Sequence, residues 1–68
     1  MYKITIRYSY AQEHNVRLFL DALGHVYDPC LYGSGYEESF STSDHAVIAE
    51  LLVLLDASRI LFYSVEIY

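Results

Sequence analysis

Hydrophobic residues recur with two different periods along the 68-residue chain, and the changes of period divide it into elements. Between residues 2 and 8, apolar and polar side chains alternate, which is typical of a strand with one buried face. From about residue 10 to residue 23, apolar side chains fall at three- and four-residue steps, as on one face of a helix. Ser9 and Gln12 stand at the capping-box spacing before this segment, and Gly24 follows it as a left-handed C-terminal residue. The pattern predicts a strand followed by a helix.

The middle of the chain is less regular and contains the strongest turn signal. Residues 25–32 predict a short, broken edge strand, because Asp28 and Pro29 would disrupt a central hydrogen-bond ladder. Gly33-Ser34-Gly35 is typical of a tight turn, and residues 36–41 alternate again after it. We therefore expect a β-hairpin here.

Residues 44–68 hold most of the aliphatic side chains, and the rest of the chain must pack around them. Their first half predicts a helix with Asp44 in its first turn and an end near Ser58, and we expect Leu51 and Leu55 in the core. From Arg59 onward the alternation predicts a final strand. One side of that strand is expected to face the helices and contribute to the core, and it presents Leu61, Tyr63, Val65 and Ile67. The other side is expected to lie on the face away from the helices, and it presents Ile60, Phe62, Ser64, Glu66 and Tyr68.

The predicted order is strand, helix, strand, strand, helix, strand, within a single domain spanning residues 1–68. This order is similar to the ferredoxin-like split βαβ arrangement, an α+β fold with both helices on one face of an antiparallel sheet. In that arrangement the first and third strands are central. The other face of the sheet stays uncovered, which makes it the candidate binding surface.

The net charge of the chain indicates which class of binding partner to expect. Nine carboxylates against four Lys and Arg give a formal net charge of −5, which opposes nucleic-acid binding and favours a protein partner with a basic surface. The alternative is that the acidity only keeps a small apolar protein soluble. No apolar run is long enough for a membrane span, no apolar leader precedes the first strand, and there is one cysteine. We therefore expect a cytoplasmic protein without a membrane partner.

Catalytic and metal-binding patterns are weak. The candidate metal ligands are His14, His25, Cys30 and His45. They lie on different elements and show none of the sequence spacings that are typical of metal-binding motifs. Glu37 and Glu38 point to opposite faces of a strand, so they cannot cooperate as an acid and a base. We expect no metal, no cofactor and no enzymatic activity.

Eight tyrosines are a heavy load for a chain of this length, and tyrosine is enriched where proteins meet proteins. Several of them are expected to fill the core, but those beside the predicted turn are harder to place there. The hypothesis is an acidic, aromatic hairpin tip that contacts the partner, made of Asp28, Tyr32, Tyr36, Glu37 and Glu38.

In its small size, acidity and lack of catalytic motifs, the chain resembles the small phage-encoded anti-CRISPR proteins. The resemblance implies an inhibitor that binds a Cas effector subunit in the host cytoplasm and blocks DNA recognition, in some members by presenting carboxylates as a DNA mimic. The competing hypothesis is a small homodimeric regulatory or ligand-sensing domain in which edge strands or open sheet faces pair. The expected state is a monomer or a weak homodimer.

Overall fold

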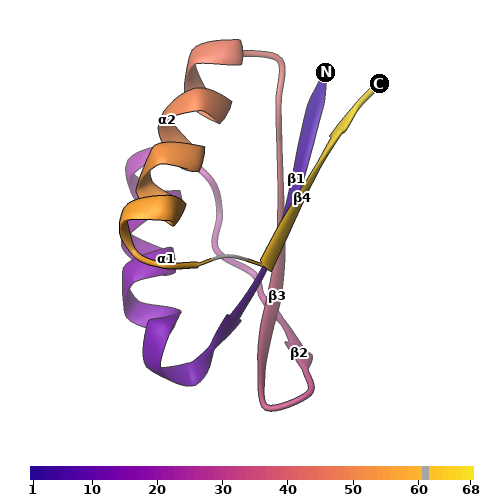
Figure 1. Cartoon of the computed structure of the whole chain (residues 1–68). Coiled ribbons are helices and arrows are strands. Elements are labelled where there is room, and N and C mark those ends of the chain that lie inside the picture. The colour runs from indigo at the N-terminus through magenta and orange to yellow at the C-terminus, as the bar shows by residue number, and fades with distance from the viewer. Residues whose placement is uncertain (61) are drawn as a thin grey trace.

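The computed structural model describes residues 1–60 and 62–68 and shows seven elements. In chain order they are β1 (Tyr2–Ser9), a 3-10 turn η1 (Tyr10–Gln12), α1 (Glu13–Ala22), β2 (Cys30–Tyr32), β3 (Gly35–Thr42), α2 (His45–Ala57) and β4 (Phe62–Ile67). The helices form one layer and the strands form the other, and the two ends of the chain lie close together (Figure 1). The expected α+β fold with split βαβ order is confirmed.

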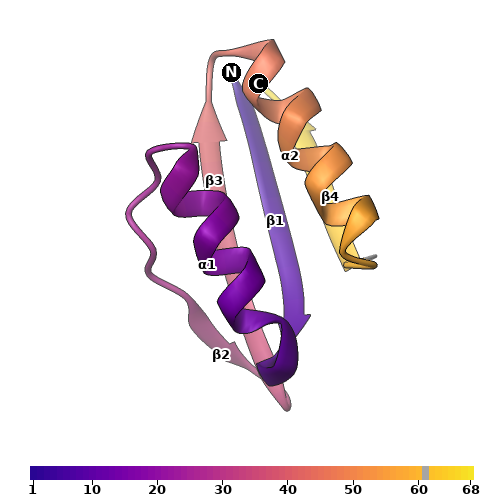
Figure 2. The same ribbon diagram turned by 90° about the vertical axis from the view of Figure 1, so that its left-hand side faces the viewer.

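The strands form one antiparallel sheet in the order β2-β3-β1-β4, with both helices on the same face (Figure 2). Ile4 of β1 stands opposite Phe40 of β3 and Val65 of β4. Because side chains alternate along a strand, the neighbours of these residues point to the face that neither helix covers. We call this the open face, and it is formed by Lys3, Thr5, Arg7, Cys30, Tyr32, Glu37, Ser39, Ser41, Phe62, Ser64 and Glu66.

The core lies between the helices and the two central strands. Its buried apolar side chains are Ile4, Ile6, Tyr8, Val16, Leu20, Phe40, Ile48, Leu51, Leu55 and Ile60. Leu51 and Leu55 are fully buried, as their spacing in the sequence predicts. The main packing contacts of α2 are with α1, β1 and β3.

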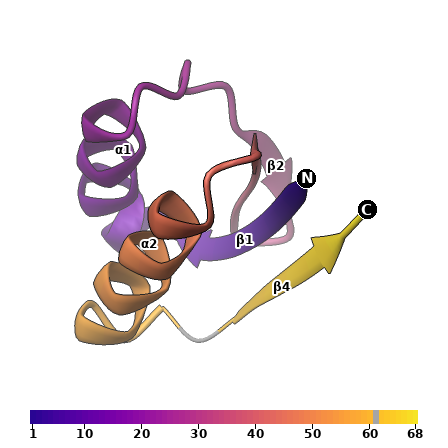
Figure 3. The same cartoon turned by 90° about the horizontal axis from the view of Figure 1, so that it is seen from above.

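The last strand departs from the sequence prediction. Every residue of β4 is exposed, including the alternating set that was expected to fill the core. α2 packs mainly on α1, β1 and β3, and Figure 3 shows β4 diverging from α2 toward the margin of the molecule. The expected position of Leu61 lies outside the described residues.

Both α-helices end in the same hydrogen-bonded motif. After α1, Gly24 adopts a left-handed φ of 81°, and the N–H of His25 donates to the carbonyl of Leu20 at 2.9 Å. After α2, Arg59 takes the left-handed position with φ 58°, and the N–H of Ile60 donates to the carbonyl of Leu55 at 2.9 Å.

The end of α2 corrects two expectations about the segment from Arg59 onward. The motif carries Ile60 back into the core, where it is buried, so it does not lie on the open face. Arg59 takes the left-handed turn before the last strand, so it does not begin that strand, which is described over Phe62–Ile67.

The edge strand β2 is shorter than predicted. Of residues 25–32, only Cys30–Tyr32 pair with β3, and the preceding segment is irregular. The hairpin turn brings Gly35 against β1, where an added Cβ would lie 2.2 Å from the carbonyl oxygen of Tyr8. At the start of α2, Asp44 is the N-cap itself, and it accepts a hydrogen bond from the N–H of Ala46 at 2.9 Å.

Candidate functional site

The hairpin distributes four of the five predicted contact residues over the two faces of the sheet. Tyr32 and Glu37 lie on the open face, whereas Tyr36 and Glu38 point toward the helices. Asp28 lies in the exposed segment before β2. The structure therefore brings together only part of the expected acidic, aromatic tip.

On the open face, Arg7 of β1 links Glu37 and Tyr32. Its Nε donates to Oε2 of Glu37 at 2.8 Å, and this hydrogen bond is the main reason that the pKa of Arg7 is raised. Its guanidinium carbon lies 4.1 Å from the centre of the Tyr32 ring. Register explains both contacts, since Arg7 stands opposite Glu37 and the hairpin places Tyr32 next to them. The carboxylate of Glu37 is thus paired within its own chain.

Glu38 is buried, and its predicted exposure at the hairpin tip is wrong. The residue is 3% exposed, and its Oε1 lies 2.5 Å from Nε2 of His25 and 3.4 Å from the N–H of Asp28, which donates to it. The other oxygen, Oε2, is buried without a hydrogen-bond partner among the described residues. The alternation of Glu38 with its half-buried neighbour Glu37 was the sequence signal for this position, because it places Glu38 on the same face as Phe40 of the core.

Tyr36 is half-buried and belongs to a group of aromatic rings at the end of the sheet. Its ring centre lies 5.7 Å from that of Tyr8 and 5.2 Å from that of Tyr10, which meets it edge-on. The hydroxyl of Tyr8 is hydrogen-bonded to that of Tyr27 at 2.7 Å. Burial raises the pKa of both Tyr8 and Tyr27 above the ordinary tyrosine value.

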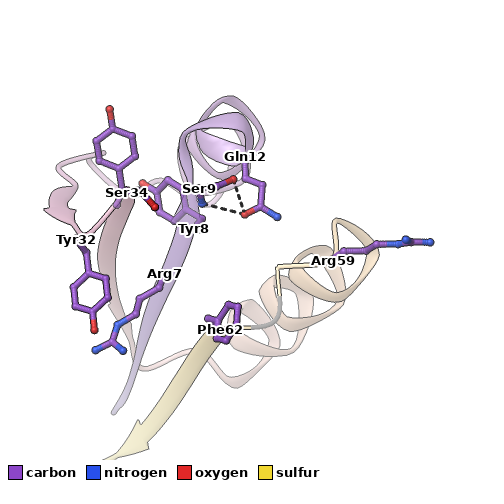
Figure 4. Close-up of a pocket in the computed structure, with 10 residues that line it drawn as sticks. Arg7, Tyr8, Ser9, Gln12, Tyr32, Ser34, Arg59 and Phe62 are labelled. Atoms are coloured by element: carbon purple, nitrogen blue, oxygen red, sulfur yellow. Dashed lines mark hydrogen bonds between the residues drawn. The ribbon is translucent and has the colours of Figure 1, made fainter.

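Beside these rings the structure has a pocket of about 480 Å³ at the hairpin end of the sheet (Figure 4). Tyr32 and Phe62 are exposed at its margin, by 49% and 76%. The guanidinium of Arg59 points away from the other side chains in Figure 4. We call this the hairpin pocket, and its lining residues are Arg7, Tyr8, Ser9, Gln12, Tyr32, Ser34, Gly35, Tyr36, Arg59 and Phe62.

The sequence hypothesis missed two residues of this pocket that matter for binding. Arg7 and Phe62 come from strands far apart in the chain, and they stand opposite each other in the sheet. Alternation places each of them on the open face, but only the pairing of β1 with β4 shows that they meet beside the hairpin.

The chemistry of the hairpin pocket suits an apolar or aromatic group with a polar edge. Aromatic rings supply apolar area, while the hydroxyls of Ser9 and Ser34 and the amide of Gln12 supply hydrogen-bonding groups at one side. In the same region, Oε1 of Gln12 accepts from the N–H of Ser9 at 3.1 Å, which holds the turn from β1 into η1.

Residues 1–60 and 62–68 hold no group of three or more His, Cys, Asp or Glu side chains arranged to bind a metal ion. None of their helices has the length and hydrophobicity needed to cross a bilayer. Cys30 is exposed and carries a free thiol.

The chain matches no protein-family model, no curated protein and no solved structure. Its own surface is therefore the basis for a functional assignment.

Proposed function

We propose that this chain is a binding protein without catalysis of its own, and that it covers part of a partner protein's surface through the hairpin pocket. The supporting observation is the pair of exposed rings, Tyr32 and Phe62, on either side of Arg7. Aromatic and arginine side chains carry much of the binding energy in protein interfaces, because they bury large areas and keep a polar group. Arg7 is already oriented by Glu37, so little of its freedom is lost on binding.

The proposed partner presents a basic surface. The formal net charge of −5 is the first reason. The second is that Arg7, one of four Lys and Arg residues, is paired with Glu37. Six exposed carboxylates are spread over helices, loops and β4, and they are Asp21, Asp28, Asp44, Glu50, Asp56 and Glu66. These charges favour encounter with a basic surface from several directions.

As the specific partner we propose a Cas effector subunit, which the chain would inhibit by covering the surface that contacts DNA. The support is the small, acidic character of the chain and its exposed carboxylates. Glu38 is buried and Glu37 is paired, so the hairpin itself does not present a row of free carboxylates as a DNA mimic. We therefore propose that the overall negative field steers association and that the hairpin pocket anchors the complex.

The test uses guide-loaded Cas effector complexes, labelled target DNA and three single variants of the chain. Tyr32→Ala and Phe62→Ala should each raise the dissociation rate about tenfold or more, since anchor residues contribute roughly 2 kcal/mol or more. The matched control is Leu18→Ala, which removes an exposed apolar side chain from α1, outside the pocket. Raising the salt concentration should slow association for all of them.

Two outcomes separate the anchor from the partner. Equal dissociation rates for Tyr32→Ala, Phe62→Ala and Leu18→Ala would show that the hairpin pocket is not the anchor. An effector that binds DNA and the chain simultaneously, with no dependence on salt, would exclude inhibition at the DNA-contacting surface.

A further inference from the structure

Strand β4 pairs with β1 along one edge, and its other edge is free. It is the last strand in the sheet order, and all six of its residues are exposed. A free edge offers unpaired backbone N–H and C=O groups to another strand, and natural proteins usually protect it with Lys, Pro or a bulge. Phe62–Ile67 contains neither Lys nor Pro, and its single charge is Glu66.

The register identifies the backbone groups that point outward. The N–H of Tyr68 donates to the carbonyl of Met1 at 2.9 Å, so the backbone of Tyr68 points toward β1. In an antiparallel pair this direction alternates from one residue to the next. The N–H and C=O groups of Tyr63, Val65 and Ile67 therefore point away from β1 and form the free edge.

We propose that a second copy of this chain pairs with that edge, antiparallel, about a two-fold axis that passes through Val65. In this register Val65 stands opposite itself, and Tyr63 stands opposite Ile67 of the second copy. Every outward backbone group of these three residues then forms a hydrogen bond, and the two sheets join into one. A two-fold interface of this kind is self-complementary, which is the commonest arrangement in soluble dimers.

Side chains on the helix side of β4 support the same register. Tyr63, Val65 and Ile67 are 41%, 37% and 78% exposed, although they stand on the face that carries the core in β1. Pairing about Val65 brings the three apolar side chains of each copy together at the centre of the joined sheet. Aromatic and β-branched pairs across strands are among the more stabilising ones.

Charge and strand overlap favour this register over its two nearest alternatives. Glu66 already stands opposite Lys3 of its own chain, and pairing about Val65 places it opposite Ser64 of the second copy. An axis at Glu66 would oppose two carboxylates, which is destabilising. An axis at Ser64 would put Phe62 opposite Glu66 and leave Ile67 beyond the start of the other β4.

The dimer would also complete the hairpin pocket. Phe62 lines that pocket and is 76% exposed, and pairing about Val65 places Tyr68 of the second copy directly opposite it. Each copy thus contributes an aromatic ring to the margin of the other copy's pocket. The dimer stands on the geometry of β4 and does not depend on the identity of the pocket's ligand.

The first test is the mass of the full chain in solution, measured by sedimentation over about 1 µM to 1 mM. A reductant is present throughout, because the exposed thiol of Cys30 could otherwise cross-link two chains. The mass should rise from 7.9 kDa toward twice that value as the concentration increases. A chain that stays at 7.9 kDa over the whole range would overturn the proposal and leave the edge to a strand of another protein.

Two charge variants test the position of the axis. Val65→Lys and Val65→Glu each place like charges opposite one another, so each should weaken the dimer about tenfold or more. A mixture of the two variants should recover a dimer that contains one copy of each. Val65→Ala is the matched control for the loss of the branched side chain. If each charged variant dimerises as tightly as the natural chain, Val65 does not lie on the axis.

A measurement on the natural sequence covers the case in which the charged variants fail to fold. In a sample that mixes isotope-labelled and unlabelled chains, the Hα protons of Ser64 in one copy and Glu66 in the other should give an intermolecular nuclear Overhauser effect. This pair lies between hydrogen-bonded pairs, where the two Cα atoms approach to about 4.5 Å. A different set of intermolecular contacts in the dimer would contradict the register.

Discussion

At the scale of single residues, the buried carboxylate of Glu38 is held by two groups from the segment that precedes β2. The ring of His25 supplies the closer contact, and the same ring lies edge-on to Phe40 at 5.1 Å between centroids. The backbone N–H of Asp28 supplies the other contact. These contacts fix the path of an irregular segment that has little secondary structure of its own.

The pairing of His25 with Glu38 gives the first prediction. Removing one partner of a buried polar pair leaves the other unsatisfied, so His25→Ala should lower the free energy of unfolding by about 1–3 kcal/mol. The double variant His25→Ala, Glu38→Gln should recover part of this loss, because it replaces the buried carboxyl group, left without its partner, by an amide. His14→Ala is the control, since His14 is exposed on α1. Chemical denaturation compares these three variants with the natural chain, and equal losses for His14→Ala and His25→Ala would contradict this role.

A second prediction concerns alkaline pH. Burial is the largest cause that raises the pKa of Tyr8 and Tyr27 above the ordinary value of 10.0. The unfolded chain therefore loses these protons at a lower pH than the folded chain does. The resulting stability is fully present below about pH 10 and is lost as the pH rises above it. Tyr8→Phe should make the alkaline decline of the unfolding midpoint shallower, and an unchanged decline would show that Tyr8 does not contribute to it.

Residue-level alternation predicts which face of a strand each side chain takes, but it cannot say which strands meet. It places Arg7 and Phe62 on the open face, whereas their meeting depends on the pairing of β1 with β4. The contact between His25 and Glu38 was not predicted for the same reason, because it joins a strand to a segment without regular periodicity.

At the scale of elements, the helices follow the sequence closely. The 3.6-residue period, the capping residues and Gly24 are local signals, and η1 and α1 together begin and end close to where these signals place them. The end of α2 is less direct, since Arg59 occupies a left-handed position that usually holds glycine or asparagine.

Arg59 gives the third prediction. A left-handed conformation costs a non-glycine residue about 1–2 kcal/mol, and glycine avoids most of this cost but loses more chain entropy on folding. Arg59→Gly should therefore raise the free energy of unfolding by about 0.5–1 kcal/mol, measured as a higher melting temperature. Gly24→Ala is the reverse control and should lower it, because Gly24 has φ 81° with open space around its Cα. A lower melting temperature for Arg59→Gly would contradict this account.

At the scale of the whole molecule, composition predicts an ordered domain but not the coverage of its sheet. Six elements in split βαβ order follow from local patterns, and the structure has them. The exposure of β4 does not follow from its sequence. An alternating strand has the same sequence pattern whether its apolar side is covered by a helix or by a second chain. In the structure the main packing contacts of α2 are with α1, β1 and β3, and β4 diverges from it (Figure 3).

The exposed strand β4 connects the hairpin pocket with the free edge of the sheet. The hairpin pocket lies at one end of the open face, and Phe62 joins it to the free edge of β4. Binding at the pocket and pairing at the edge therefore involve neighbouring residues, and each can be changed separately through Tyr32 and Val65.

Strand β4 lies at the margin of the sheet with one edge paired to β1 and one edge free, and residue-resolved hydrogen exchange distinguishes these two edges. At low protein concentration, the amides of Ser64 and Glu66, which point to β1, should be protected, while those of Tyr63, Val65 and Ile67 should exchange rapidly. Raising the concentration should protect the second set as the edge becomes paired. Equal protection of both sets at every dilution would contradict the free edge, and equally rapid exchange of both would contradict the pairing of β4 with β1.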